Sequence, residues 1–239
     1  APHGASMRIH DQFTWGRLAE LWTLDSRQYR SVQACGEPGR GGGRVVSGCD
    51  DLGLESRSLF GAEQEQWLAR GLAGSERRWK LLGQGSQICP GGIDSPLGRR
   101  IYSDGWDGYP RARERFLDAI AKARNGNVVC LGGDVHRHLA AQLRTHGNQH
   151  ESPIVGAEFV CSSLTSRGVS EAVMALMRAS NPDIVHGRSD ERGYALIDVT
   201  PDATSCEFRA TPFPAKPQAK LRPQASFVVE AGRPGVATA

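Results

Sequence analysis

The sequence has no long apolar run and no strong excess of charge of either sign. Nowhere in its 239 residues do about 18 apolar residues follow one another, which is the length that a membrane-spanning helix needs. The start of the sequence shows no basic n-region, apolar h-region and cleavage site of a secretory signal peptide. The formal net charge is only +3, and the basic residues are scattered rather than clustered. The composition therefore indicates neither a membrane span nor a nucleic-acid-binding surface.

Cysteine spacing argues against a zinc ribbon, because the six cysteines include no C-x-x-C pair. Cys35 and Cys49 flank residues 36–48, a stretch rich in glycine and arginine. A disulfide between them would close this long excursion, and we predict that it forms. Cys130 and Cys161 lie in apolar stretches, where a thiol usually behaves as a small buried side chain.

The hydrophobic pattern predicts strands and helices that alternate along one core. With 39% hydrophobic and 23% charged residues, the chain can bury a core of good size. Short apolar runs predict strands over residues 18–24, 79–84, 127–131, 139–143 and 154–163. Helical spacing of apolar residues predicts helices over residues 59–72, 111–124 and 169–179. Because strand, helix and strand follow one another from residue 79 to residue 131, we expect a crossover with parallel strand pairing.

Three local signals refine this prediction. Ser58 is available as the N-cap of the helix over residues 59–72, and Pro110 suits the first turn of the next helix. Residues 193–200 and 206–211 have the pattern of a β-hairpin. The end of the chain, from Pro212, is rich in proline and alanine and would be called a linker on composition alone.

The strongest candidate site follows the apolar run over residues 127–131. Gly132 and Gly133 break the strand, and Asp134 and His136 come directly after them. Ligands and catalytic groups tend to lie at the carboxyl ends of strands in α/β sheets, so an Asp-x-His at this place can direct an oxygen and a nitrogen at one cation. A turn in which the aspartate caps the next segment and the histidine is solvated explains the same residues. From these residues alone both interpretations stay open.

Neighbouring motifs favour the first interpretation. The stretch Trp106-Asp107-Gly108-Tyr109-Pro110, a helix, and then Gly133-Asp134-Val135-His136 resembles the PhoD-type alkaline phosphatases, a family of secreted metallophosphoesterases. Further stretches resemble the same family in the same order along nearly the whole chain: Trp15-Gly16-x-Leu18-Ala19-Glu20-Leu21, Leu24-Asp25-x-Arg27-Gln28-Tyr29-Arg30, Gly61-Ala62-Glu63-Gln64-x-x-Trp67-Leu68, Arg78-Trp79-Lys80-Leu81-Leu82-Gly83-Gln84 and Ala225-Ser226-Phe227-Val228-Val229-Glu230.

This resemblance implies an α/β fold, the calcineurin-like metallophosphoesterase sandwich with four layers (α/β/β/α). It also implies a hydrolase that cleaves phosphate monoesters or diesters, with iron and calcium as cofactors. Asp134 and His136 match the metal ligands of the family, and His136 is also a candidate catalytic residue. A mixed set of carboxylate and imidazole ligands is chemically suited to calcium and iron. Metals of this kind can clamp the phosphate and activate a hydroxide for attack on phosphorus.

Two loops offer further candidates. Arg27 follows the first predicted strand, where its guanidinium could bind a phosphate oxygen; an ion pair with Asp25 is the alternative. Asp107 and Tyr109 lie in an aromatic loop, and we predict a catalytic role for Asp107 and a substrate-binding role for Tyr109. The alternative for Asp107 is a cap of the helix that follows it.

The remaining histidines are interpreted as surface residues. His138 and Leu139 depart from the family pattern, which usually has a small polar residue followed by tryptophan. In an extended segment His138 would lie on the same side as His136, where it could add a ligand or a proton donor, but a solvated side chain is the preferred interpretation. His146, His150 and His186 lack neighbours at ligand spacing.

The resemblance covers only the C-terminal half of the family's sequence. We therefore expect residues 1–211 to be the C-terminal part of the metallophosphoesterase domain and residues 212–239 to be a partly docked tail. Two hypotheses follow: a phosphatase completed by an N-terminal half or by self-association, or an inactive fragment or interaction module. The expected partner is a small phosphate ester. The family implies a periplasmic or secreted protein.

Overall fold

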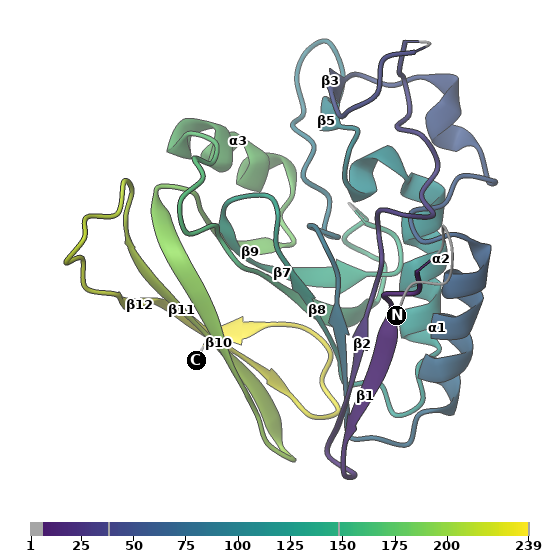
Figure 1. The fold of residues 1–239 in the computed structure, drawn as a ribbon, viewed down its shortest axis with the longest axis vertical. Helices are drawn as coiled ribbons and strands as arrows, with labels where there is room; N and C mark the ends of the chain where they lie inside the picture. Colours follow the sequence, from purple (N-terminus) through teal and green to yellow (C-terminus); the bar gives the residue numbers. More distant parts are fainter. Residues whose placement is uncertain (1–6, 38, 148, 239) are drawn as a thin grey trace.

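A seven-stranded sheet forms the centre of the molecule in the computed structural model, which describes residues 7–37, 39–147 and 149–238 (Figure 1). Residues 1–6 of the predicted domain and residue 239 of the predicted tail lie outside the described part. The strands follow one another across the sheet in this order: β1 (Asp11–Trp15), β2 (Ala19–Thr23), β4 (Trp79–Gly83), β6 (Val128–Gly132), β8 (Ile154–Val160), β7 (His138–Arg144) and β9 (Ile184–Arg188).

The middle of this sheet is parallel. Strand β2 pairs in parallel with β4, β4 with β6, and β6 with β8. The predicted parallel pairing of the strands that flank the second helix is therefore confirmed. The margins are antiparallel, because β1 pairs with β2, and β7 pairs with both β8 and β9, in that sense. Consequently β2, β4 and β6 end at the same edge of the sheet.

One face of the sheet is covered by helices α1 (Ala62–Gly74) and α2 (Pro110–Ala121), as Figure 1 shows. The helix α3 (Glu171–Ser180) contacts β9, the last strand in the order of the sheet. The core on this face joins helix residues such as Leu68 and Phe116 to strand residues such as Leu82 and Cys130. Burial of this apolar area supplies the main favourable term in the free energy of folding.

A second sheet covers the opposite face. Its strands lie in the order β10 (Glu191–Val199), β11 (Ala203–Pro212), β12 (Arg222–Glu230) and β13 (Ala237–Thr238), all antiparallel. Residues of β6 and β8, among them Val129 and Phe159, pack against Phe208 and Phe227 of the second sheet. The predicted hairpin is confirmed as β10 and β11. The predicted tail contains β12 and β13, so the residues of this stretch that resembled the family lie in a sheet.

Short elements complete the chain around residues 45–54 and 101–108. They are the strands β3 (Val45–Val46) and β5 (Ile101–Tyr102), which pair with each other, and two 3-10 helices, η1 (Asp50–Gly53) and η2 (Trp106–Gly108). The predicted disulfide is confirmed here, since Cys35 and Cys49 are bonded with their Cα atoms 5.7 Å apart. Cys130 is buried and Cys161 is half-buried, and both are free.

Helix α1 begins later than its sequence pattern predicts. Ser58 does not cap the helix; its hydroxyl instead accepts hydrogen bonds from the backbone N–H groups of Phe60 and Gly61 and donates one to Glu65. Gly61 is the N-cap and has a φ of 76°, a left-handed conformation that favours glycine. The serine therefore stabilises a turn that precedes the helix. Pro110 is the first residue of α2, as predicted.

The edge strand β1 is exposed along its whole length. Phe13 and Trp15 leave about half of their surface in solvent (47% and 54%). An open strand edge with apolar side chains is a place where another chain can pair. No helix in the described ranges has both the length and the apolar character that crossing a membrane would require.

Candidate active site

The turn after β6, residues 132–136, is called the glycine turn here. Its backbone lies very close to the backbone of Ser86. A Cβ atom on Gly132 would collide with the carbonyl oxygen of Ser86, so no other residue fits at this position. Asp134 and His136 follow with φ angles of 64° and 55°. These left-handed conformations are uncommon for residues other than glycine and often mark functional sites. The turn presents the Asp134 side chain to solvent, with 51% of it exposed.

Arg27 and Asp134 are brought together at this edge. Arg27 follows β2, Asp134 follows β6, and β4 lies between these strands. The Nη2 atom of Arg27 lies 3.7 Å from Oδ2 of Asp134. The alternative ion pair with Asp25 is not formed, because Asp25 Oδ1 accepts the backbone N–H groups of Arg27 and Gln28 instead. The sequence therefore located both residues, and the parallel sheet explains why they meet.

Asp104 anchors this arrangement, and sequence reasoning had given it no role. Its carboxylate receives Nη1 of Arg27 at 3.0 Å, Nη1 of Arg30 at 3.0 Å and the side-chain amide of Gln33 at 2.8 Å. Partial burial raises the pKa of Asp104, but the bonds from Gln33 and Arg27 and the charge of Arg30 outweigh burial, so the pKa lies below its usual value. The hydrogen bond to Asp104 also raises the pKa of Arg27. Asp104 lies two positions before the family-like stretch over residues 106–110, and no quoted motif included it.

His136 is held by the loop after β8. Its Nδ1 atom lies 3.0 Å from the carbonyl oxygen of Arg167. A carbonyl oxygen can only accept, so Nδ1 carries a proton and Nε2 is the ring nitrogen left to face a ligand. This is the arrangement in which metal-binding histidines are usually oriented. Gly168 lies against the same segment, because a Cβ atom there would collide with the carbonyl oxygen of His136.

The described residues supply only part of a metal site. Asp134 and His136 offer one carboxylate and one imidazole, which fit a cation with mixed oxygen and nitrogen ligands. Across residues 7–37, 39–147 and 149–238, no three His, Cys, Asp or Glu side chains come together as a set that could hold a metal ion. A bound metal ion would therefore need donors in addition to this pair.

Asp107 and Tyr109 face inward instead of toward a cleft. The Asp107 carboxylate accepts a hydrogen bond from Arg113 at 2.6 Å and one from the Gly91 N–H at 3.0 Å. Its helix-capping alternative is not formed, since α2 has no side-chain cap. Tyr109 is fully buried, and its hydroxyl donates to the Ser31 carbonyl at 2.6 Å. Their predicted catalytic and substrate-binding roles stay predictions, and the geometry gives each group an internal partner.

Two histidine interpretations were wrong. His138 is fully buried in β7, with its ring 4.8 Å from that of Phe208. The left-handed backbone of His136 interrupts the extended segment on which their predicted common side depended. His186 is half-buried, stacks on Phe208 at 5.8 Å and binds the Gln224 side chain at 3.0 Å. The second sheet covers both rings, and the linear sequence contained no sign of that contact.

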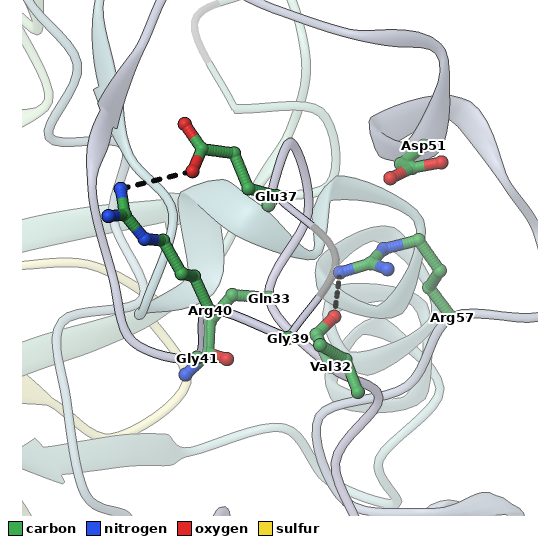
Figure 2. A pocket seen from close by; sticks show the side chains of 9 residues that line it. Val32, Gln33, Glu37, Gly39, Arg40, Gly41, Asp51 and Arg57 are labelled. Atoms are coloured by element: carbon green, nitrogen blue, oxygen red, sulfur yellow. Dashed lines mark hydrogen bonds and ion pairs between the residues drawn. The ribbon is translucent and has the colours of Figure 1, made fainter.

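A pocket of about 370 Å³ is lined by residues between Val32 and Arg57 (Figure 2). Gln33 lines it and also binds Asp104, which connects the pocket wall to Arg27. Figure 2 shows Arg40 paired with Glu37 and Arg57 bound to the carbonyl of Val32. The charged side chains that line the pocket are two arginines and two acids, Arg40, Arg57, Glu37 and Asp51. Their charges cancel, so the pocket shows no preference for an anion.

Comparison with known proteins now identifies the family. Residues 1–208 match the family described as "PhoD-like phosphatase". The chain is 36% identical to alkaline phosphatase D of Bacillus subtilis (strain 168) over 238 residues, which is 98% of this chain and 40% of that protein. A solved structure described as "Structure of PhoD" superposes with a TM-score of 0.88 at 34% identity, covering 99% of this chain and 45% of that one. The chain thus spans less than half of the length of the relatives that it matches, and it belongs to the PhoD-like phosphatase family.

Proposed function

We propose that this chain takes part in the hydrolysis of phosphate esters, as a phosphatase or phosphodiesterase of the PhoD type. The observation that carries the proposal is the pairing of Arg27 with Asp134 at the carboxyl edge of the parallel strands, beside an oriented His136. This edge is where α/β sheets place their ligands. Membership of the family and the likeness to a solved PhoD structure support the same reaction class.

In this proposal Asp134 and His136 bind metal, with iron and calcium as the expected ions. Metals at such a site would supply Lewis acidity and an activated water. His136 would present Nε2, since Nδ1 is held by the Arg167 carbonyl. Arg27 would release Asp134 and use its free Nη2 edge for a phosphate oxygen, while Nη1 stays on Asp104.

The ligands that this pair lacks must come from elsewhere. We propose that they belong to polypeptide outside these 239 residues or to a partner chain. The exposed β1 edge, with Phe13 and Trp15, gives such a polypeptide a surface to pair with. On this basis the layers of α1 and α2, the seven-stranded sheet and the four-stranded sheet would be one part of the calcineurin-like sandwich, with residues 212–239 as its docked C-terminal segment.

In this proposal the hydrogen bonds of Asp107 and Tyr109 hold the loops next to the site in place. Asp107 fixes Gly91 and Arg113, and Tyr109 fixes the segment of Ser31 that follows Arg27 and Arg30. Export to the periplasm or the cell exterior is also proposed. The Cys35–Cys49 disulfide supports it, because such bonds persist in oxidising compartments.

Two measurements on the purified chain test the proposal. They are metal analysis and the hydrolysis of p-nitrophenyl phosphate and its bis ester in the presence of Ca²⁺. If a second copy of this chain supplies the missing ligands, we expect bound metal and turnover in the wild type, and loss of both in Asp134→Ala and His136→Ala. His150→Ala is the matched control, because His150 is exposed and distant in sequence from the turn. Absence of metal and turnover from the wild-type chain would contradict the proposal for the chain by itself.

A further inference from the structure

The loop over residues 84–91 is buried although it contains no helix or strand. Gln84, Gln87, Ile88 and Cys89 each expose less than a tenth of their surface, at 8%, 6%, 0% and 2%. Loops normally run over the protein surface, because buried backbone N–H and C=O groups need partners. This loop follows β4 and leads toward η2, and its Ser86 lies against Gly132 of the glycine turn. Its polar groups must therefore be satisfied from inside the protein.

Glu158 satisfies two of these groups. It lies on β8 in the middle of the sheet and is fully buried on the helix-covered face. Its Oε1 accepts the N–H of Ile88 at 2.6 Å, and its Oε2 accepts the N–H of Cys89 at 2.8 Å. No ion pair within 4.0 Å is formed by this carboxylate with any residue of the described ranges. A buried acid costs free energy, and the two hydrogen bonds from the loop offset part of this cost.

The same loop contacts the residues at both ends of the glycine turn. Ser86 presses its carbonyl oxygen against Gly132, and the Gln84 side chain binds both backbone polar groups of Ser86. At the other end, Oε1 of Gln87 accepts Nη2 and Nε of Arg137 at 2.6 and 3.2 Å. Arg137 is buried and directly follows His136. The turn that carries Asp134 and His136 is thus fixed before and after by the same loop.

We infer that Glu158 and Gln87 are positioning residues for Asp134 and His136, acting through the loop over residues 84–91, an inference that rests on the proposed function of that pair. Left-handed backbone at two non-glycine residues persists only where the surroundings fix it. The loop supplies this constraint: Glu158 ties it to the sheet, and Gln87 ties it to Arg137. Neither side chain touches a ligand or the reacting atoms.

Amide hydrogen exchange, followed by mass spectrometry on the metal-free chain, tests this inference without requiring activity. In Glu158→Gln the side chain keeps its volume but cannot accept from both N–H groups. We expect peptides that cover residues 84–91 and 132–138 to exchange about tenfold faster, as loss of one buried hydrogen bond implies. The matched control is Glu20→Gln, another buried acid of the same sheet, bound to Ser75. It should leave both peptides at the wild-type rate.

A second pair of variants leaves Glu158 in place, so it stays informative if Glu158→Gln does not fold. Gln87→Leu removes the acceptor for Arg137, whereas Gln87→Glu retains it; both lose the donor to the Cys89 carbonyl. We expect faster exchange over residues 132–138 in the leucine variant and wild-type exchange in the glutamate variant. Equal exchange over residues 132–138 in the two variants would overturn the inference. Faster exchange over residues 84–91 with wild-type exchange over residues 132–138 would also overturn it. A chain that binds no metal, either alone or with the polypeptide that completes its site, would contradict the proposed function but leave this result standing.

Discussion

Arg27 and Asp134 meet across the end of β4, with Nη2 of the arginine 3.7 Å from Oδ2 of the aspartate. The other guanidinium nitrogen, Nη1, is held at 3.0 Å by Asp104. One edge of the guanidinium is therefore anchored, and the other points at the proposed metal ligand. At 3.7 Å this contact is longer than a hydrogen bond, so a phosphate oxygen could replace it at small cost.

Replacement of Arg27 should weaken substrate binding without removing metal. In Arg27→Ala we expect KM for p-nitrophenyl phosphate to rise about tenfold, because a charge-assisted hydrogen bond is lost. Arg27→Lys should recover only part of this loss, since an ammonium group cannot reproduce the paired donors. Steady-state kinetics and metal content measured on the same samples check the prediction. Arg233→Ala is the control, because the side chain of Arg233 is 83% exposed. Loss of metal in Arg27→Ala would contradict the assigned role.

Tyr109 should prove more important for stability than for substrate binding. Its buried hydroxyl donates to the Ser31 carbonyl, so Tyr109→Phe leaves that oxygen without its partner. We expect the free energy of unfolding to fall by about 1–2 kcal/mol, with KM unchanged within a factor of about two. Urea unfolding and steady-state kinetics measure the two quantities. Tyr29→Phe, at an exposed tyrosine, is the matched control. A large rise of KM with unchanged stability would restore the direct substrate-binding role.

The sequence predicted the elements well where the local pattern and the tertiary contacts agree. The apolar run of β6 and the glycines after it placed Asp134 and His136 at a strand end, and the parallel order of β2, β4 and β6 brought Arg27 there. The resemblance to a known family named the same residues. Local spacing and a shared motif were sufficient for this part of the site.

Contacts between distant segments were beyond the reach of the sequence. His138 was interpreted as solvated because nothing in its neighbourhood showed that Phe208 of the second sheet would cover it. Asp107 was given a catalytic role and Tyr109 a substrate-binding role because polar residues in an aromatic loop suggest a substrate entrance, and both roles stay predictions. The partner of Tyr109, Ser31, is 78 residues away in the sequence, and the ion pair of Asp107 with Arg113, six residues away, depends on how the loop meets the helix. Glu158 was missed because it lies within a β-strand whose pattern indicates only burial.

The disulfide should stabilise the long loop by restricting the unfolded chain. Cys35 and Cys49 are 14 positions apart, and a closed loop of this size is worth about 3 kcal/mol in the chain-entropy account. We expect the double variant Cys35→Ser, Cys49→Ser to lose stability of this order in urea unfolding. Reducing agent should lower the stability of the wild type and leave that of the double variant unchanged, which is the internal control. Equal stability of wild type and double variant under oxidising conditions would contradict the prediction.

Stability should depend on pH through Glu158. Burial raises the pKa of this carboxyl group from 4.5 to about 7, although the N–H groups of Cys89 and Ile88 and the charges of Arg113 and Arg137 act in the opposite direction. Between pH 4.5 and 7 the unfolded chain has therefore released this proton while the folded chain still holds it. The contribution to stability is complete below pH 4.5 and falls by about 3 kcal/mol as the pH rises to 7.

A comparison of wild type with Glu158→Gln isolates this contribution, because the other titrating groups are common to both proteins and cancel in the difference. Urea unfolding at intervals from pH 4 to pH 8 gives the free energy of unfolding of each. We expect the wild type minus the variant to decrease steadily from pH 4.5 to pH 7 and to stay constant above that range. A difference that rises over the same interval would mean that the two backbone N–H groups stabilise the carboxylate more than burial destabilises it. Glu158 would then bind the loop most strongly in its ionised form.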